Sequence, residues 1–129
     1  MYSTDSRPFT VISTIRTAAV ILIFANLTTN VSAMSFRELR VLENSNKQGV
    51  HYANYYLVGV MEGLLESHAH STRNGAAPRI CLNDRRLEPR NARSLYEAEL
   101  KRNAGTYEAD MPVQLAMMNA LTTVYTCSE

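Results

Sequence analysis

The sequence predicts an all-α protein, a compact bundle of about four helices with one disulfide that forms after a signal peptide is cleaved. Three observations support this prediction. Apolar residues recur at helical spacing through the last 96 of the 129 residues, and no alternating strand pattern competes with them. Both cysteines lie in the same part of the chain. The first 33 residues differ in composition and have the pattern of an export signal.

The first 33 residues match a signal peptide. Arg7 and Arg16 precede an apolar run over residues 17–27, and a Val-Ser-Ala sequence ending at Ala33 offers small or compact residues to a signal peptidase. The run is shorter than the roughly 20 apolar residues that cross a membrane. We therefore expect cleavage after Ala33, a periplasmic domain of residues 34–129, and no membrane association after cleavage. A retained anchor or an amphipathic helix is the alternative.

Removal of the leader leaves the domain without net charge. The leader holds two of the 13 basic residues and one of the 12 acidic residues, so 11 of each remain. A neutral domain has no broad field that attracts nucleic acid or an anionic membrane. We therefore expect a protein partner that is recognised through local shape and a few placed charges.

The two cysteines, Cys81 and Cys127, predict a disulfide, because both lie in the part of the chain that is expected in an oxidising compartment. Closing the long loop between Cys81 and Cys127 stabilises the folded state by about 4 kcal/mol when the bond is unstrained. A metal site is the alternative, but the cysteines lack a CxxC pattern or matched histidine spacing.

Turn signals divide the domain into four expected helices. The first begins at Ser35, which has the capping-box spacing to Glu38, and ends near residues 44–46. The second covers about residues 49–67 and is apolar over most of its circumference, which is typical of a central helix. Residues 68–86 contain several glycine, proline and asparagine breakers and predict a loop.

The third helix is expected over residues 89–103, and the fourth opens at Asp110 and Pro112, as a cap residue and an early proline. The expected inward positions of these two helices share the helical period: Ala92, Leu95, Tyr96 and Leu100 on the third, and Val113, Ala116, Met117, Ala120, Leu121 and Val124 on the fourth.

Two glycines on the second helix predict a packing face. Gly59 and Gly63 lie four residues apart and leave a groove on one side of the helix. Each costs about 1 kcal/mol relative to alanine inside a helix, which indicates that their small size serves a contact. We expect close approach of a neighbouring helix or of a second subunit, as in a homodimer.

The chain carries no recognisable catalytic motif such as GxSxG, HExxH or a phosphate loop. His68 and His70 are two residues apart and cannot share one helix face, so they predict surface or helix-end positions rather than a metal site. A Cys–His nucleophile pair of Cys81 and His68 is the alternative, although paired cysteines in an exported chain favour a disulfide. We expect no enzyme activity, no metal and no cofactor.

Several features occur in a set order: the run Tyr56-Leu-Val-Gly-Val-Met-Glu-Gly63, then Cys81, then Leu95-Tyr96, then Pro112, and a closing run Ala120-Leu-Thr-Thr-Val-Tyr-Thr-Cys127. Together they resemble the Rap/Tai family of immunity proteins, which neutralise peptidoglycan-cleaving amidases delivered by type VI secretion. The resemblance covers nearly all of the domain. It implies a mostly helical periplasmic protein with one disulfide that tends to form homodimers.

Carried over residue by residue, the resemblance matches Cys81 and Cys127 to the bridging pair, and Gly59 and Gly63 to the small positions of the central helix. The chain departs from the family pattern after Cys81, where Leu-Asn-Asp-Arg-Arg replaces a segment with an early proline, and at Thr126, where proline is usual.

The resemblance implies that the protein inhibits a type VI amidase toxin by occluding its active cleft. Two loops are candidates, residues 67–79 and residues 103–110, and the shorter one is favoured because a loop held by helices at both ends loses less entropy on docking. The candidate contact residues are one pair in each loop: His70 and Arg73 in the first, Tyr107 and Glu108 in the second. The alternatives are a small periplasmic chaperone of the acid-stress type and a family member without a toxin partner.

Overall fold

The structure, a computed structural model, describes residues 33–128. The chain divides into two units, residues 1–32 and residues 33–129, and only the second is described below. Residues 1–32 of the expected signal peptide lie outside the described residues, and only its last residue, Ala33, is described. Within residues 33–128, each helix is too short or too polar to span a lipid bilayer.

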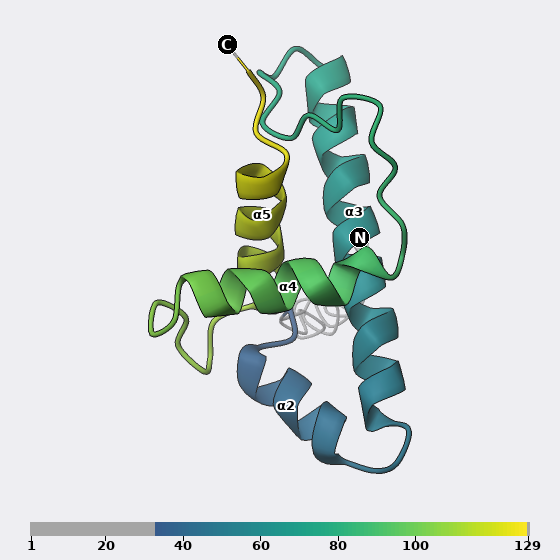
Figure 1. Cartoon of the computed structure of the whole chain (residues 1–129), viewed down its shortest axis with the longest axis vertical. Helices are drawn as coiled ribbons and strands as arrows, with labels where there is room; N and C mark the ends of the chain where they lie inside the picture. The colour runs from purple at the N-terminus through teal and green to yellow at the C-terminus, as the bar shows by residue number, and fades with distance from the viewer. Residues whose placement is uncertain (1–32, 129) are drawn as a thin grey trace, which may run out of the picture. The chain divides into compact units, whose positions relative to one another are not determined.

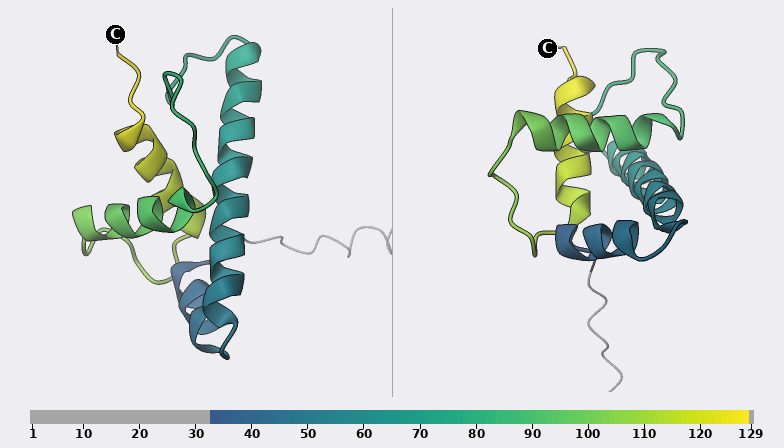
Figure 2. Two further views of the ribbon diagram at one scale, coloured as in Figure 1. Left: turned by 45° about the vertical axis from the view of Figure 1, so that its right-hand side comes forward. Right: turned by 60° about the horizontal axis from the view of Figure 1, so that its bottom comes forward.

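Four helices make up the described part of the chain: α2 (Phe36–Asn44), α3 (Gly49–Arg73), α4 (Asn91–Arg102) and α5 (Val113–Val124). The long helix α3 packs against α2 near its start and against α5 near its middle (Figures 1 and 2). Helix α4 lies across α3 and α5 and packs on both of them. The predicted all-α architecture of about four helices is confirmed.

Helix α2 begins with the predicted capping box. The Glu38 N–H donates to Ser35 Oγ at 3.3 Å, and the Ser35 N–H donates to Glu38 Oε2 at 2.7 Å. The bonds from Ser35 lower the pKa of the Glu38 carboxyl, since they favour its charged form. Two otherwise unsatisfied N–H groups at the helix start thus find acceptors.

The start of the domain is fastened to the start of α5. Ser35 and Pro112 form an isolated antiparallel bridge, in which the Phe36 N–H donates to the Met111 carbonyl at 3.1 Å. The Val113 N–H donates to the carbonyl of Met34 at 3.0 Å. This contact joins segments that lie far apart in the sequence and gives the first residues of the domain a fixed position.

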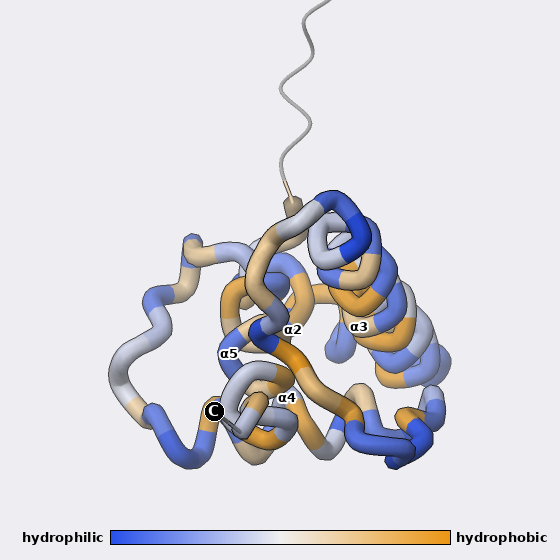
Figure 3. The backbone as a smooth tube through the Cα atoms, turned by 90° about the horizontal axis from the view of Figure 1, so that it is seen from above, coloured by the Kyte–Doolittle hydropathy of each residue, from blue (hydrophilic) through white to orange (hydrophobic). Residues whose placement is uncertain are grey.

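The core forms between all four helices, and seen from above many hydrophilic positions lie on the peripheral loops (Figure 3). On α4 the predicted positions Ala92, Leu95 and Tyr96 are buried, and Leu100 is partly buried. The predicted positions of α5 are buried with one exception: Val113, Ala116, Met117, Ala120 and Leu121 lie inside, whereas Val124 is exposed. Val124 lies in the last turn of α5, where the next residue, Tyr125, takes the buried position instead.

Arg93 links three helices. Its Nη1 pairs with Glu43 Oε1 of α2 at 2.6 Å, and its Nε donates to Asn54 Oδ1 of α3 at 2.7 Å. Three quarters of each charged side chain is buried. A partly buried ion pair with a further hydrogen bond fixes the orientation of the helices more strongly than an exposed pair does.

Two predicted boundaries are wrong. Helix α3 does not end near Ser67 but continues to Arg73, because residues 68–73 include no helix breaker and the chain turns only at Gly75, whose φ is +92°. The cap residue of α5 is Pro112 rather than Asp110. The Asp110 carboxylate instead pairs with Arg37 of α2 at 2.9 Å.

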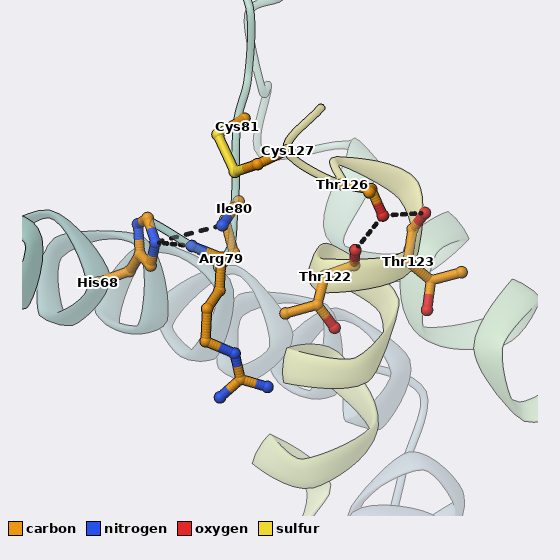
Figure 4. Close-up of a disulfide and its surroundings, with 8 residues drawn as sticks. All are labelled: His68, Arg79, Ile80, Cys81, Thr122, Thr123, Thr126 and Cys127. Atoms are coloured by element: carbon orange, nitrogen blue, oxygen red, sulfur yellow. Dashed lines mark hydrogen bonds between the residues drawn. A yellow bond between two sulfur atoms is a disulfide. The ribbon is translucent and has the colours of Figure 1, made fainter. Parts of the chain in front are cut away.

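The predicted disulfide is confirmed. Cys81 and Cys127 are bonded, with their Cα atoms 4.9 Å apart, and the bond joins the segment after α3 to the residues that follow α5 (Figure 4). The Cys81 N–H also donates to the carbonyl of Tyr125 at 2.7 Å. This pairing removes the metal site and the Cys–His nucleophile as roles for Cys81.

Replacing Cys127 with Ser is expected to lower the free energy of unfolding by about 2–5 kcal/mol, because the unfolded chain regains the freedom that the closed loop removes. Urea unfolding of the oxidised wild type and the variant measures the difference. The reduced wild type is the control and should match the variant. Equal stability of all three proteins would contradict this expectation.

Candidate functional site

The described residues offer no metal centre. Among residues 33–128, no group of three or more His, Cys, Asp or Glu side chains could hold a metal ion. His68 and His70 lie in the last turns of α3, as helix-end positions. Two exposed features stand out in the described domain: one face of α3 and the segment that follows it.

His68 holds the segment after α3 in place. Its Nε2 accepts the Arg79 N–H at 2.9 Å and the Ile80 N–H at 3.2 Å, two residues before the disulfide (Figure 4). An imidazole nitrogen that accepts two bonds carries its lone pair, so the ring hydrogen resides on Nδ1. The segment is therefore fixed at two neighbouring points, the imidazole and the Cys81–Cys127 bond.

The two glycines of α3 line an open groove. A hollow of about 430 Å³ lies over Gly59 and Gly63, and its other lining residues come from α3 and α5: Tyr56, Val60, Leu64 and Gln114. A Cβ atom at either glycine would meet nothing within 4 Å. No neighbouring helix among residues 33–128 approaches the two glycines, and the expected contact with a second subunit stays a prediction.

Gln114 and Tyr56 meet at the edge of this groove. Gln114 Nε2 donates to the Tyr56 hydroxyl at 2.9 Å, and its Oε1 is buried without a partner among residues 33–128. Burial raises the pKa of Tyr56, and the bond from Gln114 opposes that effect. The groove thus combines an apolar floor with one polar edge.

Aromatic and apolar side chains are exposed on the first half of α3. Tyr55 is 76% exposed, Tyr52 49% and Val50 51%. Single exposed apolar residues are common, but tyrosine is enriched at protein interfaces. Three of the six large hydrophobic side chains that are exposed among the described residues thus lie on α3, the helix that also carries the glycine groove.

Tyr107 does not project from its loop, contrary to the expectation. Its hydroxyl donates to Glu99 Oε1 at 2.6 Å and accepts from Asn119 Nδ2 at 3.0 Å, and its ring centroid lies 5.4 Å from that of Phe36. Burial and the bond to Glu99 raise the pKa of Tyr107. Of the predicted pair in this loop, only Glu108 is exposed.

Glu99 is the buried partner that sequence reasoning missed. The side chain is 1% exposed, and it accepts from Arg102 Nη1, Asn103 Nδ2 and Tyr107 Oη, each at 2.6 Å. The sequence does indicate that this position is buried, because Glu99 continues the inward stripe of α4 seven residues after Ala92. Its charge argued against burial, which is tolerated here because several donors satisfy it.

The other predicted pair lies on the last turn of α3 rather than in a loop. His70 is exposed and its ring lies 3.2 Å from Asn74 Nδ2. Arg73 pairs with Glu66 at 2.9 Å, and both side chains are exposed. An exposed pair of this kind contributes little to stability, so Arg73 is free to exchange partners.

These features define a small, disulfide-closed helical domain with an open groove on α3 and an exposed, fastened segment after it. No family model matches the chain, and neither does a curated protein or a solved structure. The resemblance to the Rap/Tai family therefore rests on the residues quoted above.

Alanine at two glycines is expected to have opposite effects. A Cβ atom at Gly49 would collide with the Leu42 carbonyl oxygen and lie 2.7 Å from that of Glu43, so Gly49→Ala should destabilise the domain by about 1–3 kcal/mol. Gly63→Ala meets open space and should stabilise α3 by about 0.5–1 kcal/mol. Urea unfolding at low protein concentration measures both. A destabilised Gly63→Ala monomer would contradict the open groove.

Stability is expected to fall in alkali. Burial raises the pKa of Tyr96 from 10.0 to about 12, and the pKa of Tyr107 is raised as well. A raised pKa contributes stability that is complete below the unfolded-state value and is lost as pH rises through the folded-state value. The free energy of unfolding, measured in urea, should therefore decrease between pH 10.0 and about 12. Tyr107→Phe should show a smaller decrease, and an unchanged slope in this variant would remove Tyr107 as a cause.

Proposed function

We propose that this protein is a periplasmic immunity protein that binds a type VI secretion peptidoglycan amidase and occludes its active cleft. The observation that carries the proposal is the segment after α3, which is exposed but held by the Cys81–Cys127 bond and by His68. A surface that is already ordered loses little conformational entropy on docking. The resemblance to the Rap/Tai family supplies the class of partner.

The blocking element in this proposal is the end of α3 and the segment that follows it. The loop of residues 103–110 is less suitable, because the side chain of Tyr107 is engaged by Glu99 and Asn119. His70 and Arg73 stand exposed at the end of α3, next to the turn at Gly75. Occlusion requires a rigid surface and no reactive group of its own.

The proposal includes a homodimer through the glycine groove of α3. The groove is open, apolar and bounded by Tyr56 and Leu64, and no side chain of the described chain fills the space over Gly59 and Gly63. In a two-fold symmetric dimer the same face meets its own copy, so one open groove on each subunit is sufficient. This arrangement leaves the far end of α3 for the amidase.

The test is inhibition of the amidase encoded beside this gene, with purified proteins and by protection of cells in which both are exported. His70→Ala and Arg73→Ala should each weaken binding by about 1 kcal/mol, or about fivefold, as residues in a contact surface do. Glu108→Ala is the matched control in the other loop and should bind as the wild type does.

Three results would contradict the proposal. Loss of binding in Glu108→Ala alone would move the blocking element to residues 103–110. A wild-type protein that neither binds nor inhibits the amidase would remove the immunity function. Binding of unfolded client proteins only in acid would favour the chaperone alternative.

A further inference from the structure

The connection between α3 and α4 is locally basic. Residues 73–93 contain six arginines against two acidic residues, whereas residues 34–129 contain equal numbers of basic and acidic residues. A neutral domain thus carries one segment with a net positive charge. Such a local excess can select a partner by charge even though the whole domain has no broad field.

Half of these arginines have a carboxylate partner among the described residues. Three pair with carboxylates at 2.6–2.9 Å: Arg73 with Glu66, Arg90 with Glu88, and Arg93 with Glu43. The other three, Arg79, Arg85 and Arg86, have no carboxylate partner among residues 33–128. All three residues are exposed.

The segment that carries the unpaired arginines is held from both sides. Arg79 donates its N–H to His68, and Cys81 is bonded to Cys127 (Figure 4). The chain then turns at Asn83 and Asp84, whose φ values of 47° and 62° are left-handed and are tolerated by few residues besides glycine. These constraints give an exposed segment a defined conformation.

Arg85 is positioned by its own side-chain contacts. Its guanidinium carbon lies 4.6 Å from the centre of the Tyr125 ring, and its Nε donates to the Leu82 carbonyl at 3.1 Å. The two terminal nitrogens have no partner among residues 33–128. A guanidinium that is held through Nε and has both terminal nitrogens unbonded can donate two parallel hydrogen bonds to a carboxylate.

We propose that Arg79, Arg85 and Arg86 bind an acidic surface of a protein partner. Arginine, unlike lysine, forms two parallel hydrogen bonds with a carboxylate and is enriched at protein interfaces. The eight residues 79–86 span at most about 25 Å, so all three arginines fit within one interface of about 800 Å² per partner. The neutral domain lacks the extended positive field that a nucleic acid or a membrane requires.

This inference deepens the proposed function and rests on it for the identity of the partner, since it assigns the amidase an acidic surface beside its cleft. The chemistry of the surface itself does not depend on that identity. An acidic polypeptide, poly-L-glutamate, is therefore the first probe, and the amidase encoded beside the gene is the second.

The experiment compares two double variants of equal charge change. Arg79→Gln/Arg86→Gln removes two unpaired arginines of the segment. Lys47→Gln/Lys101→Gln removes two exposed lysines that also have no carboxylate partner among residues 33–128. Arg85 stays unchanged, because its contact with Tyr125 supports the fold. Circular dichroism and urea unfolding establish that both variants fold.

The arginine variant should bind poly-L-glutamate about tenfold more weakly than the wild type at low salt, and the lysine variant should lose little. Raising the salt concentration should weaken wild-type binding and reduce the difference. Equal losses in the two variants would overturn the proposal. Tighter wild-type binding to duplex DNA or to phosphatidylglycerol vesicles than to poly-L-glutamate would overturn it as well.

The amidase arm separates this inference from the proposed function. If the amidase is inhibited equally by both variants, the arginine surface is wrong and the immunity function stands. If poly-L-glutamate binding depends on the arginines but the amidase does not bind the wild type, the surface stands and the immunity function fails.

Discussion

The buried carboxylate of Glu99 is the constraint on which much of the domain depends. A side chain of this kind is tolerated in a core only when its oxygens are satisfied, and the donors come from Arg102, Asn103 and Tyr107. Because Tyr107 reaches inward, the middle of the connection between α4 and α5 is held against the core, while most of its other residues stay exposed. That connection leads directly to Pro112 and to the bridge with Ser35, so one carboxylate organises the end of α4, the start of α5 and the first residues of the domain.

This arrangement separates the parts of the molecule that make the fold from the parts that are available to a partner. The α4–α5 connection carries polar side chains, yet its aromatic residue is used internally. At the other end, the segment after α3 is held by hydrogen bonds from its backbone to His68 and by the disulfide. The side chains of Arg79 and Arg86 therefore take no part in holding it. A backbone clamp orders a segment without consuming its side chains, which is what a recognition surface needs.

The regular parts of the structure follow from the sequence, and the exceptions have physical causes. The stripe of α5, apart from Val124, and the capping box at Ser35 follow from residue spacing, the disulfide follows from the pair of cysteines, and all three are correctly predicted. Glycines illustrate the limit: Gly59 and Gly63 have the pattern of a packing face but stand open, whereas Gly49, which has no pattern, lies against the carbonyl oxygens at the end of α2. Gly49 is close-packed because the chain turns between α2 and α3 beside it, and the sequence pattern does not reveal that path. The orientation of Tyr107 likewise depends on Glu99, whose burial contradicts its residue type.

Both edges of the described domain are tied to its interior, the first by hydrogen bonds between Met34–Phe36 and Met111–Val113 and the last by Cys127. Chain ends and loose loops are where proteases ordinarily begin to cut. A protease that attacked either edge would meet a backbone already engaged in the fold, and it could advance only after a substantial part of the domain had opened. The fastening of the two edges therefore couples proteolysis at the edges to the stability of the domain.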